Sequence, residues 1–428
     1  MVMISILQRF VSHLLGSSTR EAATLPARPN GDSPVNVVIV GGGVIGLCTA
    51  YQLAKLANSQ FDSRINIVVL EARVSTFQSA SSHNTGCLHY GYEEPFGSDL
   101  LPLGKYSFDI WKSIAEDDED FKKETGYRAQ SFFWVACGDN DGIEKVLPNW
   151  VKIGNHWKMV EKGHGDNCAT INPEKLGAWL ENACTSLGVT IQTSTTATEA
   201  IISEEGTIEA IRCVLADRAG ERLLPCNSLV LAAGPWTPQQ IQTMFPHSTL
   251  DLAPTTLAGD WLLLKNAIHP DEKSTASVFF NHIVGEKLEF SGRNDRTIWV
   301  CGKTNSTASL PPLGEETPPD DLQVADLLEY SRQFIRDFDD TGDENDTLTV
   351  VDKGRSFRPM RQSGLPLITE IPSQFISLIK PPKQRSGVFV SYGHGSYGTS
   401  LGIGSGKLMA QLILGEDLDI DLSKFTIR

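Results

Sequence analysis

A short run of glycines near the start of the chain has the spacing of a phosphate-binding turn. Gly41-Gly42-Gly43-Val44-Ile45-Gly46 follows the β-branched run VNVVIV and leads into the helical pattern LCTAYQLAKL. Gly41 permits a tight turn, Gly43 lets the backbone approach a pyrophosphate, and Gly46 lets helix and strand pack closely. The free N–H groups and positive dipole end of the helix then attract an anion. This pattern predicts a dinucleotide-binding strand, turn and helix.

An acid stands at the end of the next strand-like run. INIVVL ends at Glu71, whose carboxylate can accept hydrogen bonds from the ribose hydroxyls of an adenosine. The acid lies further from the glycines than the usual separation of about 20 residues, and we assign the excess to the polar stretch NSQFDSR, because loops tolerate insertions. Ala72 and Arg73 follow. Arg73 could indicate NADP, but it stands two residues beyond the acid.

Composition excludes several classes of protein. The length of 428 residues suggests two or three domains, and the 40% hydrophobic and 21% charged residues are typical of a soluble globular protein. A net charge of −15 gives nucleic acid no general attraction. The eight cysteines form no C-x-x-C pair, which argues against a zinc site. No apolar run reaches the roughly 18 residues that span a bilayer. From these three observations we expect no metal, no nucleic-acid partner and no membrane span.

Residues 1–34 are interpreted as an N-terminal extension. Residues 1–20 contain Arg9, Arg20 and several serines but no acid, with apolar residues at helical spacing, which resembles a mitochondrial transit peptide. A disordered extension is the alternative, because chain termini are commonly disordered. We expect a cytoplasmic protein and keep mitochondrial targeting as the second option.

Further motifs follow in a fixed order. Ser81-Ser82-His83-Asn84 forms a small polar loop after the acid. Ala197 lies in the strand-like run after the helical EKLGAWLENACTSLG, and Ala233-Gly234-Pro235-Trp236 ends the buried run LVLA. Near the end of the chain, a G-H-G-x-x-G loop precedes the helical SGKLMAQLIL. This loop and its flank comprise Gly393, His394, Gly395, Ser396, Tyr397, Gly398, Thr399 and Ser400.

In this order, the motifs resemble those of the D-amino-acid oxidase superfamily, which includes glycine and sarcosine oxidases and fungal FAD-dependent oxidoreductases of unassigned substrate. The resemblance covers nearly the whole chain from Val35 and implies FAD as the cofactor. By position in the family pattern, the serine loop lies against the flavin, the backbone of Ala197 touches the adenine, and the Ala233–Trp236 segment passes the cofactor. The closing loop would direct N–H donors at the flavin N1/O2 edge, where negative charge develops on reduction.

The resemblance also implies a substrate anchor. Arg358 matches the arginine that precedes proline in the family's R-P motif and would pair with a substrate carboxylate, a task that suits a guanidinium fork. The alternative is an arginine held by internal salt bridges, because the motif also occurs in relatives whose substrates are not amino acids. Tyr397 would line the site, with a packed aromatic as the alternative.

Three departures from the family pattern qualify these expectations. The cysteine that tethers the flavin in sarcosine-oxidase-like members has no counterpart at 355–362, which implies non-covalent FAD. His83 stands near the place where some dimethylglycine-oxidising relatives carry a flavin-linked histidine, so a covalent link through His83 is the alternative. Lys303 is displaced from the lysine that assists oxygen activation in sarcosine oxidases. The electron acceptor is therefore left open, with O2 as one candidate.

These observations predict an α/β fold with a Rossmann-like FAD-binding domain containing a parallel sheet, plus an α+β substrate domain with an antiparallel sheet. The FAD-binding domain would be discontinuous, comprising 35–90, 155–236 and 350–428, and the substrate domain would comprise 91–154 and 237–349. Strand-like runs DWLLLK, KLEF and TIWVCG would roof the flavin. The acidic segment after residue 314 reads as one amphipathic helix between exposed loops.

The first functional hypothesis is an FAD-dependent oxidoreductase that takes a hydride from a small substrate, at the C–N bond of an amino acid or amine. Oxidation of an alcohol or another carbon centre in a specialised fungal pathway is the alternative, and the pair Asp260-Trp261 could serve it. A flavin-bound trafficking or interaction protein is the third. The oligomeric state is left open.

Overall fold

The computed structural model describes most of the chain. The described ranges are 34–59, 65–90, 97–139, 142–154, 156–163, 165–216, 220–252, 255–265, 275–281, 287–293, 295–336, 348–376 and 386–427. The expected extension, apart from Pro34, lies outside the described residues, and so does its targeting role. Among the described residues, no helix combines the length and hydropathy that a bilayer crossing requires.

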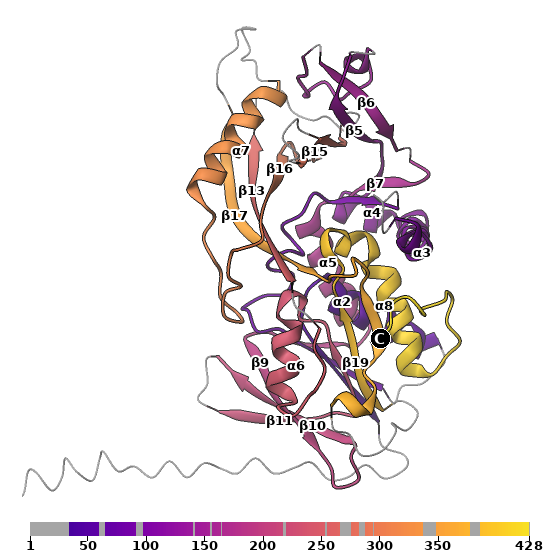
Figure 1. Ribbon diagram of the computed structural model, residues 1–428. Coiled ribbons are helices and arrows are strands. Elements are labelled where there is room, and N and C mark those ends of the chain that lie inside the picture. The colour runs from indigo at the N-terminus through magenta and orange to yellow at the C-terminus, as the bar shows by residue number, and fades with distance from the viewer. Residues whose placement is uncertain are drawn as a thin grey trace, which may run out of the picture.

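A six-stranded sheet forms the centre of the lower half in Figure 1. Its strand order is β18 (Leu367–Glu370), β19 (Gly387–Tyr392), β12 (Ser228–Leu231), β1 (Val35–Val40), β2 (Ile65–Leu70) and β8 (Thr190–Gln192). All neighbours are parallel except β18 and β19. Strands such as VNVVIV are almost wholly apolar because both faces of a parallel sheet are covered.

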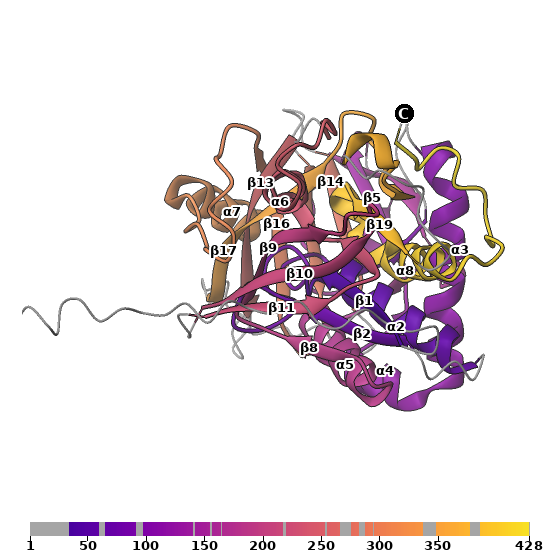
Figure 2. The same cartoon turned by 90° about the horizontal axis from the view of Figure 1, so that it is seen from below.

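Helices and a small sheet cover this parallel sheet. One face packs against α2 (Val44–Ser59), α5 (Pro173–Ser186) and α8 (Gly398–Leu414), and α3 (Gly97–Asp117) packs against α8. The other face packs against α6 (Thr237–Met244) and the sheet of β9 (Thr195–Ile202), β10 (Ile208–Leu215) and β11 (Glu221–Pro225). Figure 2 shows this small sheet and the helices α3, α5 and α8.

A seven-stranded sheet lies in the upper half of Figure 1. Its order is β17 (Thr349–Met360), β13 (Thr255–Lys265), β16 (Ile298–Asn305), β15 (Lys287–Gly292), β14 (Ser277–Asn281), β5 (Phe132–Cys137) and β6 (Trp157–Lys162). Only β14 and β5 pair in parallel. Three short strands, β3 (Cys87–His89), β7 (Cys168–Thr170) and β4 (Arg128–Ala129), form a further sheet.

The expected fold class, a parallel-sheet FAD-type fold with an additional antiparallel sheet, is confirmed. The expected roof runs DWLLLK, KLEF and TIWVCG lie in β13, β15 and β16. The acidic segment contains one helix, α7 (Asp321–Phe334), capped by Asp320. Strands β6 and β17, which fall in segments expected for the FAD domain, pair within the seven-stranded sheet. The division into two domains stays a prediction.

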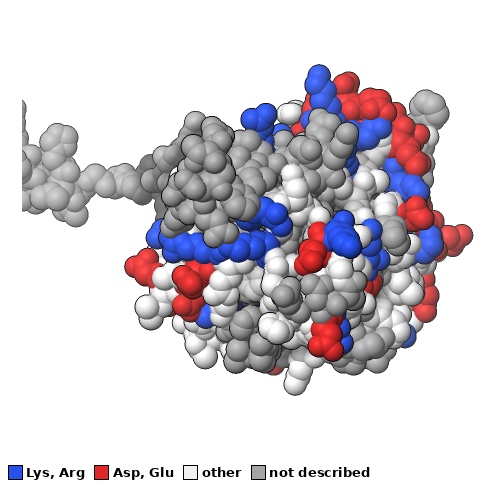
Figure 3. All heavy atoms as spheres, turned by 90° about the horizontal axis from the view of Figure 1, so that it is seen from above, with Lys and Arg blue, Asp and Glu red and all other residues white. Residues whose placement is uncertain are grey.

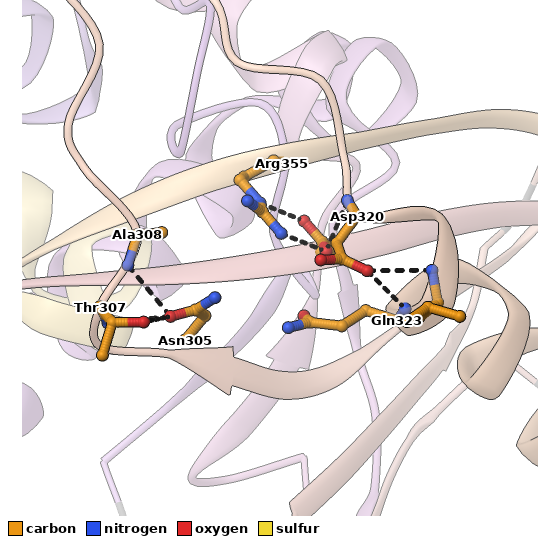
Figure 4. Close-up of polar contacts among 8 residues, drawn as sticks. Asn305, Thr307, Ala308, Asp320, Gln323 and Arg355 are labelled. Carbon is orange, nitrogen blue, oxygen red and sulfur yellow. Dashed lines mark hydrogen bonds and ion pairs between the residues drawn. The ribbon is translucent and has the colours of Figure 1, made fainter.

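The two long β-strands β13 and β17 are joined by a buried ion pair. Asp260 is fully buried and accepts two hydrogen bonds from the Arg355 guanidinium, at 2.7 and 2.8 Å. Its Oδ2 also accepts from the N–H of Asp320, the residue that caps α7. Figure 4 shows Arg355 next to Asp320 at the start of α7. The pair therefore ties two strands and one helix together.

Unlike the buried Asp260–Arg355 pair, the charged side chains on the surface form exposed pairs. On the face seen from above in Figure 3, acidic and basic side chains of the described residues adjoin one another. Pairs such as Lys105–Asp109 and Lys303–Asp326 leave at least one partner more than half exposed. Exposed pairs of this kind contribute little to stability.

Removing the guanidinium of the buried pair should destabilise the protein strongly. Arg355→Leu leaves the Asp260 carboxylate buried without a counter-charge, and we expect a loss of about 3–5 kcal/mol in the free energy of unfolding. Chemical denaturation of the flavin-loaded protein measures it. Lys105→Leu, which removes an exposed pair, is the control and should change stability far less. Equal losses in the two variants would contradict the assigned role.

Candidate active site

The predicted motifs meet at one edge of the parallel sheet. β1 ends before Gly41, β2 before Glu71, β12 before Ala232 and β19 before Gly393. Because these four strands are parallel, their carboxyl ends lie at the same edge. Ligands of open α/β sheets bind outside that edge. The topology thus brings together segments that are far apart in the sequence.

The glycine turn leaves no room for side chains. Gly41 has φ +113°, and a Cβ there would lie 2.3 Å from the carbonyl oxygen of Ala232. A Cβ on Gly46 would lie 1.9 Å from the carbonyl oxygen of Gly41. The turn therefore packs directly on β12, and α2 packs directly on the turn. Gly46 supports the site through packing rather than by lining the cavity.

A serine loop crosses the start of α2. The hydroxyl of Ser81 accepts a hydrogen bond from the N–H of Val44 at 3.0 Å. A Cβ on Gly43 would lie 2.9 Å from that hydroxyl oxygen. The Asn84 amide donates to the carbonyls of Ala80 and Ser81, and its oxygen accepts from the N–H of Gly86, which holds the loop in shape. The loop is thus fixed against the phosphate-binding turn.

Glu71 is held by backbone donors. Its two carboxylate oxygens accept hydrogen bonds from the N–H groups of Gly42 and Arg73, at 2.8 and 2.9 Å. Burial raises the pKa of Glu71, and these two N–H groups offset part of the rise. The carboxylate is therefore fixed beside the glycine turn, in the position expected for a ribose-binding acid.

Arg73 is engaged elsewhere. Its guanidinium pairs with Glu316 at 2.5 Å and donates to the carbonyl of Glu315 at 2.7 Å. Both partners belong to the segment 306–320, which joins β16 to α7 and whose Leu313 and Gly314 line the cavity. Arg73 is thus neutralised by the protein, which does not favour a 2′-phosphate partner.

Segment 306–320 is fixed at further points. The Trp236 indole donates to the carbonyl of Pro311 at 2.8 Å. Where the segment leaves β16, the side-chain oxygen of Asn305 accepts from the N–H groups of Thr307 and Ala308, at 2.8 and 3.0 Å (Figure 4). The sequence assigned the acidic part of this segment to exposed loops, and its contact with Arg73 was not predicted.

One continuous cavity, of about 1670 Å³ including its open mouth, runs along these elements. It is lined by nearly all the residues expected to bind the cofactor: Gly41, Gly43, Val44, Ile45, Glu71, Ala72, Arg73, Ser81, His83, Asn84, Ala197, Ala233, Gly234, Trp236, His394, Gly395, Ser396, Gly398, Thr399 and Ser400. Arg358 and Tyr397 line it too. Gly46, Ser82 and Gly393 do not. Their contacts with a ligand, like those of the others, stay a prediction.

His394 is a buried, neutral side chain that connects the closing loop to α8. Its ring is buried and its Nε2 lies 3.0 Å from the Ser405 hydroxyl of α8. Burial lowers the pKa of His394 to about 3, so the ring is neutral at neutral pH. The ring connects the loop to α8, and the residues Gly395 to Gly398 line the cavity.

His83 stacks on a tryptophan of the roof. Its ring lies 4.4 Å from the Trp261 ring, and Trp261 in turn stacks on Trp299 at 4.7 Å. Burial lowers the pKa of His83 to about 4, so this ring is also neutral at neutral pH. His83 therefore joins the serine loop to the seven-stranded sheet. A covalent link to flavin through His83 is not tested by this geometry.

One row of the seven-stranded sheet lines the opposite side of the cavity. Trp261 of β13 pairs in register with Cys301, Cys301 with Glu289, and Glu289 with Phe279. All four residues line the cavity. Their neighbours along the strands, such as Leu262 and Phe290, point to the other face, into the core beneath α7. The sheet roofs the cavity as expected.

Arg358 presents an unpaired guanidinium. No hydrogen bond and no ion pair joins it to another residue in the described part of the chain, and it lines the cavity. Gly259 on the neighbouring strand makes room for it, because a Cβ there would lie 2.9 Å from an Arg358 nitrogen. The alternative of an arginine held by internal salt bridges is not supported among these residues.

Glu289 is a cavity carboxylate that the sequence analysis missed. Its Oε2 accepts hydrogen bonds from the Thr85 hydroxyl at 2.5 Å and the Cys301 thiol at 3.6 Å. Its Oε1 lies 3.8 Å from the ammonium of Lys287. Burial alone would raise the pKa of Glu289, but the charges of Lys287 and Arg358 and the two hydrogen bonds together lower it. The only sequence signal was an acid in the alternating run KLEF, which equally fits a solvent-facing position.

Two residues singled out in the sequence lie elsewhere. Asp260, considered for alcohol oxidation, is bonded to Arg355 and Asp320 and does not line the cavity. It occupies the opposite face of β13 from Trp261, because successive side chains alternate. Lys303 pairs with Asp326 of α7 at 2.5 Å and does not line the cavity either.

Enlarging Gly43 should abolish flavin binding. The added side chain of Gly43→Val would displace the Ser81 hydroxyl and fill the space beside the helix N-terminus, where the pyrophosphate is expected. The ratio of flavin to protein absorbance in the purified variant measures the effect. Gly154→Val is the matched control, since a Cβ there meets no atom within 4 Å. Wild-type flavin content in Gly43→Val would refute the assignment.

Comparison with known proteins agrees with this geometry. The DAO family, described as FAD dependent oxidoreductase, matches residues 36–412. A Schizosaccharomyces pombe protein named as an oxidoreductase is 26% identical over 409 residues, covering 89% of this chain and 94% of the relative.

Two solved structures share the fold. Glycine oxidase from Geobacillus kaustophilus superposes with a TM-score of 0.69 at 17% identity, covering 92% of this chain and 98% of its own. L-Amino acid deaminase from Proteus myxofaciens, in complex with anthranilate, superposes with a TM-score of 0.67 at 15% identity, covering 95% of this chain and 96% of its own. Because the family match spans most of the sequence, the chain belongs to the DAO family and is an FAD-dependent oxidoreductase.

Proposed function

We propose that this enzyme oxidises the C–N bond of a small amino acid or related amine that carries a carboxylate, and that Arg358 anchors the carboxylate. The observation that carries the proposal is the unpaired Arg358 guanidinium in the cavity wall. A guanidinium in a partly dry cavity favours an anionic partner, and its planar fork fits a carboxylate. The relatives named glycine oxidase and L-amino acid deaminase act on amino acids, which supports the same substrate class.

The cavity fits FAD along its length. Gly41 and Gly43 leave the backbone bare where a pyrophosphate would approach, and Glu71 stands where an adenosine ribose would lie. Across the cavity, the Gly395–Gly398 backbone and the start of α8 offer N–H groups and a positive dipole end. When bound, FAD supplies the hydride acceptor. The protein's part is to hold the substrate carboxylate at Arg358 and to exclude water with the aromatic roof of Trp261, Trp299 and Phe279.

The two other functions have less support. Alcohol oxidation was linked to the pair Asp260-Trp261. Trp261 lines the cavity, but the Asp260 carboxylate is bonded to Arg355 and Asp320 on the far face of the sheet. Lys303 lies near the position that the oxygen-activating lysine of sarcosine oxidases would have in this sequence, and it pairs with Asp326 of α7. No observation in the described residues favours a trafficking role over the enzyme.

Removing the Arg358 fork should impair turnover without loss of flavin. Arg358→Leu would remove a charge-assisted interaction, and we expect kcat/KM for amino acids to fall by roughly 10² or more. Arg358→Lys should recover little, because an ammonium cannot form the two-pronged contact. Arg212→Leu, in the small sheet, is the control. Unchanged turnover in a fully flavinated Arg358→Leu variant would remove the amino-acid proposal.

The flavin is proposed to be held without a covalent bond. No cysteine stands at 355–362, where sarcosine-oxidase-like members tether the ring. Acid precipitation of the yellow protein should therefore release the flavin into the supernatant. Colour that stays in the protein pellet would contradict the proposal, and His83→Ala would then show whether His83 carries the link.

A further inference from the structure

A second charged group, the carboxylate of Glu289, also lines the cavity, and one of its oxygens accepts no hydrogen bond from the described part of the chain. Oε2 of Glu289 is occupied by the Thr85 hydroxyl and the Cys301 thiol. Oε1 receives no hydrogen bond from any residue that the structure describes. Lys287 comes closest at 3.8 Å, and its ammonium lies over the rings of Trp134 and Phe279, 4.6 and 5.1 Å from their centres. Among the described residues, Oε1 thus has one long ion pair, with Lys287, and no hydrogen bond.

Burial of Glu289 favours a hydrogen-bonding partner for its Oε1. The Glu289 side chain is only 17% exposed, so little water reaches it. Burying an ionised oxygen without a hydrogen bond is costly. The 3.8 Å ion pair with Lys287 offsets part of that cost, and a cation or a strong hydrogen-bond donor closer to Oε1 would offset more. Arg358 does not fill the role, because no nitrogen of its guanidinium lies within ion-pair distance of Glu289. Within the described ranges, the cavity therefore presents the Arg358 guanidinium, which has no ion-pair partner, and the Glu289 carboxylate, whose Oε1 has only the 3.8 Å ion pair with Lys287.

The reacting nitrogen is a poor partner for Glu289. When a hydride leaves the carbon bonded to the nitrogen, the nitrogen lone pair forms the new C=N bond, so the nitrogen must be uncharged. The surroundings of Glu289 lower its pKa, and an ionised carboxylate stabilises the cationic form of any amine that it contacts. A bond between Glu289 and the reacting nitrogen would hold that nitrogen in its unreactive form. A cationic group elsewhere on the substrate has no such conflict.

The surrounding walls suit a cation on an apolar stem. Trp261, Trp299 and Phe279 line the same part of the cavity as Glu289. Aromatic faces accept methylene groups and attract a nearby ammonium. A substrate side chain with a carboxylate would instead be repelled by Glu289.

We propose that Glu289 selects the charge on the distal part of the substrate, so that the enzyme prefers an amino acid whose side chain ends in a cation and disfavours one whose side chain ends in a carboxylate. This inference rests on the proposed oxidation of amino acids at Arg358. It assigns Glu289 as a specificity-determining residue, while Arg358 fixes the carboxylate common to all the substrates.

The test compares ornithine, glutamine and glutamate as substrates of the flavin-loaded protein. The wild type should show a higher kcat/KM for ornithine than for glutamine, and the lowest value for glutamate. Glu289→Gln keeps an oxygen for the Thr85 hydroxyl, and it should lower the ratio of ornithine to glutamine by about tenfold to a hundredfold. Glutamine itself should change little. Glu116→Gln on α3 is the surface control, and flavin content and thermal unfolding report on the fold.

Each outcome has one meaning. An unchanged ratio of ornithine to glutamine in a flavinated Glu289→Gln variant overturns the assignment of Glu289 while leaving the proposed function intact. If no amino acid reduces the flavin or shifts its absorbance, the carboxylate anchor fails. In that case 1,4-diaminobutane against butylamine tests Glu289 alone, and the diamine should be preferred in the wild type but not in Glu289→Gln. The proposal is overturned if the wild type prefers neither ornithine over glutamine nor 1,4-diaminobutane over butylamine.

Discussion

The buried pair between Asp260 and Arg355 fixes the register of β13 and β17, and the roof of the active site depends on that register. With this pair directed at α7, alternation places Trp261 and Arg358 on the opposite face, toward the cavity. A shift of one residue would reverse both faces. The cost of exposing or separating two buried charges therefore protects the position of Arg358, the proposed substrate anchor, although neither charge touches the cavity.

The cavity has two ends with different electrostatics. At the edge of the parallel sheet, backbone N–H groups and the start of α2 provide a field for an anion, and the ionisable groups Glu71 and Arg73 are already paired with the protein. At the roof, Arg358 has no ion-pair partner among the described residues, and Oε1 of Glu289 has only the 3.8 Å ion pair with Lys287. The first end is complete for a cofactor of fixed structure. At the second end, the proposed substrate would supply the missing partners.

Local signals in the sequence predicted the glycine turn and the acid that follows the next strand. The glycine spacing and Glu71 report on contacts within one strand, turn and helix, and the structure places these residues at one edge of the sheet. Arg358 and the closing loop came from resemblance to a family, and their ligand contacts stay predictions. Asp260 was misplaced because both faces of β13 are buried, so alternation cannot show which face meets the cavity.

The remaining parts could not be predicted from the sequence because they are set by pairing across strands. Glu289 gains its place from its register with Cys301 and Phe279 and from a hydrogen bond to Thr85, 204 residues away in the sequence. The tie between Arg73 and Glu316 likewise joins segments 243 residues apart. The most direct test of the account is anaerobic mixing of the flavin-loaded protein with amino acids and, separately, with sugar alcohols, while the oxidised-flavin absorbance is followed. The account predicts bleaching by an amino acid and none by a sugar alcohol. Bleaching by a sugar alcohol with none by any amino acid or amine would contradict it.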